Sequence, residues 1–204
     1  MYKFIKRASD FIISAILIII FLPVWTLIPL CILVTMKRPV LYKQKRIGLN
    51  NREFEIIKFR SMSKKSPAAS TDAQRITKMG RILRITRIDE LPQLYNIIIG
   101  DMSFIGPRPL LPEYLPFYTS DELRRHDVRP GLSGLSQISG SYQKWEEQFI
   151  LDIQYVNSLS FINDLRIFAM TLRKVFKPSQ KLITGNPGRE RFDVYRMNQN
   201  KSTT

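Results

Sequence analysis

Two adjacent acids, Asp89 and Glu90, stand among arginines in the segment LRITRIDELPQLYN. Arg84 and Arg87 precede the two acids, and Arg108 follows them between two prolines. A carboxylate is a weak nucleophile, and it approaches an anionic phosphate readily only where cations neutralise the phosphate oxygens. This arrangement of acids and cations is therefore compatible with chemistry on a phosphate.

The same two acids also fit the start of a helix. Leu91 and Leu94 begin an apolar pattern with the 3.6-residue period, and Gly100 is a natural helix terminator. Asp89 then suits the N-cap and Glu90 the first turn, where the helix dipole favours negative charge. From the residues alone, this capping role is favoured over a catalytic one.

Among the cations, Arg108 is restricted by the prolines on either side of it. A guanidinium held in this way is suited to a bidentate grip on phosphate, and equally to a structural contact with a carbonyl or carboxylate. Lys58 and Arg60 are two residues apart, so on a strand they would share one face.

Composition narrows the kinds of chemistry that are open to the chain. Its 204 residues suit either one domain with a sizeable core or a modest domain plus an appendage, and its formal net charge of +15 predicts attraction to polyanions. The single cysteine, Cys31, excludes an intrachain disulfide, and with one histidine, interpreted as structural or on the surface, zinc chemistry is disfavoured. The sequence has neither a G-x-x-x-x-G-K-[ST] loop nor a G-x-G-x-x-G fingerprint. Carboxylates and cations, with or without a hard metal ion, must carry any reaction.

An uncharged run of 26 residues, 11–36, is long enough to cross a bilayer, for which about 20 apolar residues suffice. Its length argues against a cleaved signal peptide. Pro23 predicts a kink, because proline removes a helical hydrogen bond. Cations flank the run on both sides: Lys3, Lys6, Arg7, Lys37 and Arg38. Since such flanks prefer the cytoplasmic side, a re-entrant hairpin broken at Leu22-Pro23 is favoured over a single kinked crossing.

After this run, a β-hairpin is predicted from residues 40–42 and 54–59 around a turn at 48–51. The small polar residues of 63–74 predict a loop, either a binding lid or plain disorder. Cations recur every third residue over 75–87 and would form an oblique ridge on a helix, either solvated or against lipid headgroups.

Two helical patterns follow, at 145–157 and 160–176, and the chain from 177 onward is polar and poorly patterned. The second pattern carries an apolar stripe, which is interpreted as facing the core rather than a membrane. The stripe consists of Phe161, Leu165, Phe168, Leu172 and Val175.

Several longer motifs occur in a defined order along nearly the whole chain. They are Lys6-Arg7 with Asp10, KFRSM at 58–62, GRILR at 80–84, IDELPQLYN at 88–96, GDMSFIGPRP at 100–109, VRPGLSG at 128–134 and a DxxY at 152–155. With these motifs the chain resembles the monotopic phosphoglycosyl transferases, also called the bacterial sugar transferase family, in their small form with only the catalytic domain.

The resemblance implies an α/β fold: a small, mixed, membrane-associated domain with a re-entrant N-terminal helix, a β-hairpin and several amphipathic helices. It divides the chain into a re-entrant anchor at 1–38, a catalytic domain on the cytoplasmic face at 39–180 and a polar C-terminal tail at 181–204.

The resemblance also implies an enzyme of the bacterial inner membrane. It would transfer a sugar 1-phosphate from a UDP-sugar to undecaprenyl phosphate and release UMP, as the first membrane step in assembling an O-antigen, capsule, exopolysaccharide or glycoprotein glycan. The family uses Mg²⁺ and an Asp-Glu pair, here Asp89 and Glu90, which would also hold the metal. Glu90 would help to hold Mg²⁺ or manage the acceptor proton. Asp89 would be the nucleophile and form a phosphosugar-aspartyl intermediate. Anionic lipids are expected partners, nucleic acid is not, and a homodimer is left open.

By the same resemblance, phosphates would be bound by cations near the acid pair. The candidates are Arg84 and Arg108, followed by Lys58, Arg87, Arg129 and Asp152. Two positions depart from the family pattern. Leu22 stands where the family has a serine before the proline, and this removes a side-chain hydrogen bond at the bend. Ser141 stands where the family usually has an arginine, which puts the donor preference in question, with Lys144 as a candidate substitute.

Two rival functions stay open at this stage. The charge of +15 by itself would suit a membrane-tethered binder of nucleic acid or anionic lipid, whose affinity falls steeply with salt. The other rival is a non-catalytic scaffold, and the intact Asp89-Glu90 pair argues against it.

Overall fold

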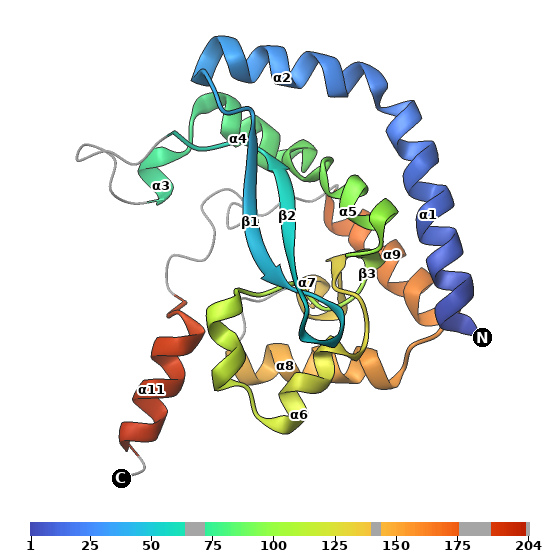
Figure 1. The fold of residues 1–204 in the computed structure, drawn as a ribbon, viewed down its shortest axis with the longest axis vertical. Coiled ribbons are helices and arrows are strands. Elements are labelled where there is room, and N and C mark those ends of the chain that lie inside the picture. Colours follow the sequence, from blue (N-terminus) through green and yellow to red (C-terminus); the bar gives the residue numbers. More distant parts are fainter. Residues whose placement is uncertain (64–71, 140–143, 176–188, 203–204) are drawn as a thin grey trace.

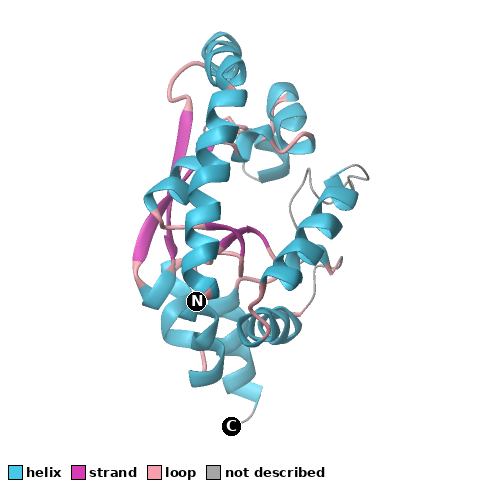
Figure 2. Cartoon of the chain, turned by 90° about the vertical axis from the view of Figure 1, so that its right-hand side faces the viewer, coloured by secondary structure: helices cyan, strands magenta, loops and turns pink. Residues whose placement is uncertain are grey.

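The structure, a computed structural model, describes residues 1–63, 72–139, 144–175 and 189–202. It is mostly helical, with small two-stranded sheets (Figures 1 and 2). Most of the predicted loop at 63–74 lies outside the described residues, and its last three residues, 72–74, form part of a helix instead. The departure at Ser141 also lies outside the described residues.

The N-terminal apolar run forms two helices, α1 (Tyr2–Ile20) and α2 (Leu22–Met36), which wrap around one corner of the molecule (Figure 1). They meet at Phe21 with a bend of 63°. Pro23 lies in the first turn of α2, where a missing N–H costs no helical hydrogen bond. In the described chain, no single helix is long and apolar enough to cross a bilayer, but this bent pair meets that requirement taken together.

The predicted β-hairpin is confirmed. Strands β1 (Leu41–Ile47) and β2 (Glu53–Phe59) pair antiparallel, with Leu41 opposite Phe59. The turn contains a short 3₁₀ helix, η1 (Leu49–Asn51), in which Asn50 and Asn51 have positive φ angles of 53° and 60°. Asparagine tolerates this left-handed region better than most residues, which explains the Asn-Asn pair at the turn.

Arg60 does not share a strand face with Lys58, because β2 ends at Phe59. The side chain of Arg60 is buried and turns back to the end of α2. There its guanidinium donates to the carbonyl oxygens of Met36, Lys37 (2.5 Å) and Arg38 (3.2 Å). The last carbonyls of a helix lack internal partners, so Arg60 satisfies them and ties the hairpin to the N-terminal helices.

The predicted ridge of cations is not formed, because the segment does not make one helix. It is divided into α3 (Asp72–Arg75), α4 (Lys78–Ile85) and a 3₁₀ turn, η2 (Ile88–Glu90), ahead of α5 (Gln93–Ile99). Thr77 starts α4 by accepting a hydrogen bond from the Gly80 N–H at 2.9 Å. The arginines of this segment therefore have different partners: Arg75 donates to the Ser63 carbonyl, Arg84 to the Ser61 hydroxyl, and Arg87 pairs with Glu90.

Several of the remaining elements lie below the hairpin in Figure 1. The remaining described elements are β3 (Ser103–Ile105), η3 (Pro112–Phe117), α6 (Ser120–Leu123), η4 (Arg124–Asp127), β4 (Gly131–Ser133), α7 (Leu135–Ile138), α8 (Trp145–Asn157), α9 (Phe161–Val175) and α11 (Phe192–Ser202). Strands β3 and β4 pair parallel, and they meet where Gly106 passes so close to Gly131 that a side chain on either would collide with backbone.

The stripe on α9 does not face the core, and this prediction is wrong. Phe161, Leu165, Phe168 and Leu172 are between 44% and 64% exposed. Ile167, on the other side of the helix, is fully buried. Periodicity shows that one side of a helix is apolar, but it does not distinguish a protein core from a lipid environment.

The predicted polar tail contains an ordered helix that docks on the domain. In α11, Phe192 is 0% exposed and packs among Tyr114, Tyr118, Trp145 and Phe149. Its ring centroid lies 5.1–5.6 Å from those of these four residues. Phe192 is thus the buried anchor of α11, and Tyr195, which packs against the same cluster, and the ion pair of Arg196 with Glu122 add further contacts.

Phe192→Ala is expected to lower the free energy of unfolding by roughly 3 kcal/mol, or to release α11 from the domain, because it leaves a cavity in this cluster. Thermal unfolding in detergent and limited proteolysis of the C-terminal segment would measure both effects. Met197→Ala, at an exposed position of the same helix, is the matched control. Equal melting temperatures and equal protease resistance for the two variants would contradict the docking role.

Candidate active site

Asp89 lies in the 3₁₀ turn η2, and it does not cap α5. The chain enters this turn through Arg87, which adopts the left-handed conformation with φ 59°. Helix α5 begins only at Gln93, after Pro92, and its N-terminus has no side-chain cap. The capping role favoured from the residues alone is therefore wrong, and the carboxylate of Asp89 makes no capping hydrogen bond to α5.

The Asp89 side chain is only 7% exposed. Burial raises the pKa of its carboxyl to about 6, and the neighbouring charge of Glu90 adds to the rise, whereas Lys58, Arg84 and Arg87 oppose it. Within the described residues, no hydrogen bond to this carboxylate contributes to the shift of its pKa. Asp89 is thus a largely desolvated carboxylate that is ionised at neutral pH and has no hydrogen-bond partner in the described part of the chain, as suits a nucleophile.

Glu90 has the opposite character. Its carboxylate accepts from the Lys58 ammonium at 2.7 Å and lies 3.5 Å from the Arg87 guanidinium. Burial would raise the pKa of Glu90, but Lys58, Arg87 and Arg108 together lower it to about 2. The pKa values of the two adjacent acids therefore differ by about four units. Glu90 stays ionised, whereas Asp89 titrates about one pH unit below neutral.

Two arginines complete the surroundings of the acid pair. The Nε of Arg84, at the end of α4, donates to the Ser61 hydroxyl at 3.0 Å. The side chain of Arg108 is exposed, while its backbone carbonyl accepts from the buried Arg125 at 2.7 Å. The backbone of Arg108 is therefore fixed and its guanidinium is accessible to a ligand.

The structure does not bring the last two predicted residues to this cluster. Arg129 donates from Nε to the Gly100 carbonyl at 2.7 Å, at the far end of α5. Asp152 is fully buried and binds Arg125 at 2.7 Å and the Ser136 hydroxyl at 2.8 Å. The contacts of Asp152 are those of a structural ion pair.

Two cations were missed from the sequence. Arg125 lies in the basic run RRHDVR, where nothing distinguishes it from its neighbours, yet it is the one that supports Arg108 and Asp152. Lys174, on α9, donates to the Gln137 carbonyl at 2.8 Å. Burial and the nearby charge of Arg87 lower the pKa of Lys174, so α9 adds positive charge on the side of the site occupied by Arg87.

Comparison with known proteins identifies the class to which this site belongs. A model of the bacterial sugar transferase family matches residues 1–178. The chain belongs to that family. Its relatives in this family include the uncharacterized sugar transferase EpsL of Bacillus subtilis, which is 45% identical over 158 residues, 76% of this chain and 78% of the relative. Family membership confirms the predicted enzyme class, a phosphoglycosyl transferase.

Longer sugar transferases also match. The UDP-glucose:undecaprenyl-phosphate glucose-1-phosphate transferase of Klebsiella pneumoniae is 35% identical over 185 residues, which are 84% of this chain but 40% of the relative. The UDP-N-acetylgalactosamine-undecaprenyl-phosphate N-acetylgalactosaminephosphotransferase of Aeromonas hydrophila is 36% identical over 190 residues, 85% of this chain and 44% of the relative. The chain thus spans less than half the length of these two relatives.

Asp89 and Glu90 of this sugar transferase fit a Mg²⁺ ion. Proteins usually hold Mg²⁺ by one or two carboxylates together with substrate phosphates and water. Asp89 is a buried carboxylate without a hydrogen bond in the described chain, and Glu90 keeps lone pairs beyond those used by Lys58 and Arg87. The described residues contain no group of three His, Cys, Asp or Glu that could hold a metal without substrate.

Lys58→Gln is expected to move the acidic limb of the sugar transferase's pH–rate profile to higher pH. The Lys58 ammonium favours the ionised form of Asp89, so its loss raises the pKa of Asp89 above about 6 and lowers the rate at pH 6 relative to pH 8 several-fold. The profile of kcat/KM between pH 5 and 9 measures this. Lys43→Gln, at an exposed lysine on β1, should leave the limb in place. An unshifted limb in Lys58→Gln would remove Lys58 from the electrostatics of the site.

Proposed function

We propose that this sugar transferase moves a sugar 1-phosphate from a UDP-sugar to undecaprenyl phosphate and releases UMP. The printed activities of the Klebsiella and Aeromonas relatives support this substrate pair. The observation that carries the proposal is Asp89: a buried carboxylate with a pKa of about 6, beside an ionised Glu90 and among cations.

In the proposed first step, a carboxylate oxygen of Asp89 attacks the β-phosphorus of the UDP-sugar. A bond forms between this oxygen and phosphorus, the bond from phosphorus to the bridging oxygen breaks, and UMP leaves with the electron pair. In the second step, a phosphate oxygen of undecaprenyl phosphate attacks the same phosphorus and Asp89 is released as carboxylate. Two displacements let a water-soluble donor and a lipid acceptor use one site in turn.

The surrounding cations have a defined task in both steps. Attack by a carboxylate on a diphosphate brings negative charges together, and Arg84, Arg87 and Arg108 offset this repulsion. Lys58 keeps Glu90 ionised and in place. Bound Mg²⁺ would supply further neutralisation of the phosphate oxygens, held by Asp89 and Glu90.

We further propose that the protein sits at the cytoplasmic face of the bacterial inner membrane, with α1 and α2 as a re-entrant anchor. The 63° bend at Phe21 and the cationic flanks on both sides of the apolar run support this arrangement. The exposed apolar stripe of α9 would lie against lipid as a second contact. This location suits the first membrane step of glycan assembly, since the acceptor lipid and the nucleotide sugar both reach the site.

Purified protein with Mg²⁺, undecaprenyl phosphate and a panel of UDP-sugars tests the proposed reaction by release of UMP. With at least one donor, UMP should be released in turnover amounts when the acceptor lipid is present, and in no more than one equivalent per chain when it is absent. Absence of UMP with every donor would favour a membrane-tethered binder. Such a binder would show salt-dependent binding to anionic vesicles or nucleic acid, and this would not change on substitution of Asp89.

The topology is tested separately by cysteine labelling. Cys31 is exposed and is first replaced by serine, and single cysteines are then introduced by Lys3→Cys and Lys37→Cys. A membrane-impermeant reagent should label both positions in inside-out vesicles and neither in intact spheroplasts. Labelling of the two positions from opposite sides would replace the re-entrant anchor by a single crossing.

A further inference from the structure

A second cationic cavity lies at the N-terminal end of α1, apart from the Asp89 cluster. Its volume is about 260 Å³. Residues from α1, the hairpin turn, β3 and the segment before β4 line it, and they include Lys3, Lys6, Arg7, Asp10, Asp127 and Arg129. The proposed reaction uses none of these residues, although Lys6-Arg7, Asp10 and Arg129 all belong to the motifs found in the sequence.

The cavity carries an excess of positive charge. Four of its lining side chains are cationic and two are acidic, so the lining has a formal charge of +2. The cations crowd one another: burial lowers the pKa of Arg129, and Arg7 lowers it further. Repulsion of this kind is relieved when an anion enters, so the cavity is electrostatically suited to a phosphate.

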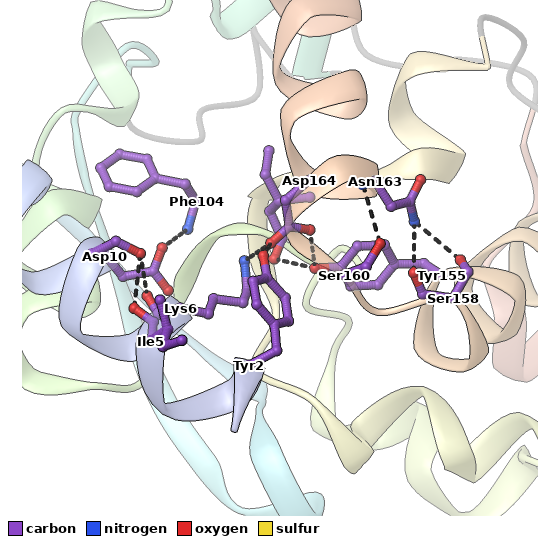
Figure 3. A network of polar contacts seen from close by, with 12 residues as sticks. Tyr2, Ile5, Lys6, Asp10, Phe104, Tyr155, Ser158, Ser160, Asn163 and Asp164 are labelled. Atoms are coloured by element: carbon purple, nitrogen blue, oxygen red, sulfur yellow. Dashed lines mark hydrogen bonds and ion pairs between the residues drawn. The ribbon is translucent and has the colours of Figure 1, made fainter.

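The cationic side chains are held in position by other parts of the fold. Lys6 binds Asp164 of α9 at 2.6 Å, and Asp164 also accepts from the hydroxyls of Tyr2 and Tyr155 (Figure 3). Arg7 donates to the carbonyls of Ile97 and Ile98 at the end of α5. These contacts organise the cavity before any ligand arrives, which reduces the entropy lost on binding.

Two cations keep donors for a ligand. Arg129 uses only Nε, toward the Gly100 carbonyl, so in the described chain its two terminal amino groups have no hydrogen-bond partner. Lys3 is exposed, and among the described residues its ammonium contacts only the Asp127 carbonyl, at 3.5 Å. A guanidinium edge and an ammonium are the donors that bind phosphate oxygens in proteins.

Exposed apolar side chains are close in the chain to residues that line this cavity. In sequence, Phe4 and Ile5 lie between the lining residues Lys3 and Lys6, and Phe161 and Ile162 follow shortly after the lining residue Leu159, at the start of α9. The bond between Lys6 and Asp164 brings the starts of these two helices together (Figure 3). A phosphate-binding cavity next to exposed apolar side chains has the two-part chemistry of a phospholipid, an anionic headgroup joined to acyl chains.

We propose that this cavity binds the phosphate headgroup of an anionic phospholipid, with the acyl chains against the apolar side chains of α1 and α9. Lys3 and Arg129 donate to the phosphate, and Lys6 and Arg7 supply fixed positive charge. The site lies at the cytoplasmic end of α1, where headgroups would be found if the anchor is re-entrant. It rests on the proposed membrane attachment and not on the proposed reaction.

Native mass spectrometry of the full chain, released from nanodiscs of equal phosphatidylglycerol and phosphatidylcholine, tests this site. The wild-type protein should retain one phosphatidylglycerol per chain in preference to phosphatidylcholine. Lys3→Gln with Arg129→Gln should reduce this retention at least tenfold. Lys43→Gln with Lys45→Gln removes the same charge from exposed lysines of β1 and should retain the lipid. Equal loss in both double variants, or no preference in the wild type, would overturn the site.

Arg129 also contacts Gly100, so its substitution could disturb the fold. Lys3→Glu is the second variant, because Lys3 is exposed and its reversal of charge should abolish retention without lowering the melting temperature. Inorganic phosphate at 10 mM should not displace the lipid, and displacement would assign the cavity to a soluble anion instead. Flotation with phosphatidylcholine vesicles reports membrane attachment, and UMP release reports the reaction, so failure of either is distinguished from failure of this site.

Discussion

Asp89→Asn is expected to abolish sugar-phosphate transfer and, at the same time, to stabilise the folded protein at neutral pH. The amide cannot attack phosphorus, so loss of activity follows directly if Asp89 is the nucleophile. The gain in stability has a separate cause. Asp89 is buried with a folded-state pKa of about 6, above its ordinary value of 3.8, so its ionised form is disfavoured in the folded protein.

The sign and the pH window follow from linkage. Because the folded state binds this proton more tightly than the unfolded state, the cost of ionising Asp89 develops as pH rises from about 4 to about 6 and is complete above that range. About two pKa units correspond to roughly 3 kcal/mol. Asp89→Asn should therefore gain up to roughly this amount at pH 8 and almost nothing below pH 4.

Unfolding in detergent at pH 4 and pH 8, together with UMP release, measures both effects. Asp121→Asn, at an exposed acid in the first turn of α6, is the control and should change neither quantity appreciably. Incubation with donor alone should also add the mass of a phosphosugar to the peptide that carries Asp89. Substantial turnover by Asp89→Asn, or product formation without a mass increase on this peptide, would remove Asp89 from the nucleophilic role.

Asp152→Ala is expected to cost about 3–5 kcal/mol of folding free energy, because it leaves Arg125 as an unpaired charge in the interior. Both side chains of this ion pair are only 1% exposed. Arg125 is also 5.5 Å from the centre of the Phe149 ring and donates to the Arg108 carbonyl. Asp152→Ala should therefore lower the melting temperature and the yield of folded protein. The activity of the protein that still folds should change only as far as the position of Arg108 changes.

A double variant distinguishes the cost of leaving Arg125 unpaired from the cost of losing the ion pair as a whole. Arg125→Met with Asp152→Ala removes both charges, so it should be more stable than Asp152→Ala alone. Glu55→Ala, which breaks the exposed contact with Lys43, should cost less than about 1 kcal/mol. If Asp152→Ala were no more costly than Glu55→Ala, or the double variant lost the sum of both single changes, the buried pair would not have the role assigned to it.

Local patterns in the sequence predicted much of the fold. The hairpin and the helix at 145–157 were identified correctly, because turn residues and apolar periodicity act over a few neighbouring positions. Helix α11 in the C-terminal tail was not predicted, because its docking depends on Phe192 packing into a cluster of residues that are distant in the chain. A single buried aromatic residue in a short helix leaves no periodic signal.

The same distinction applies to the site. The sequence by itself supplied the Asp89-Glu90 pair, the cations around it and the apolar run before it, because these are residue types and spacings. The tertiary contacts show that Asp89 is a buried carboxylate rather than a helix cap, without a hydrogen bond from the described residues, and that Lys58, 32 residues away, holds Glu90. Burial and pairing set the protonation of a carboxyl group, and both are made by contacts between distant segments, which no local pattern records.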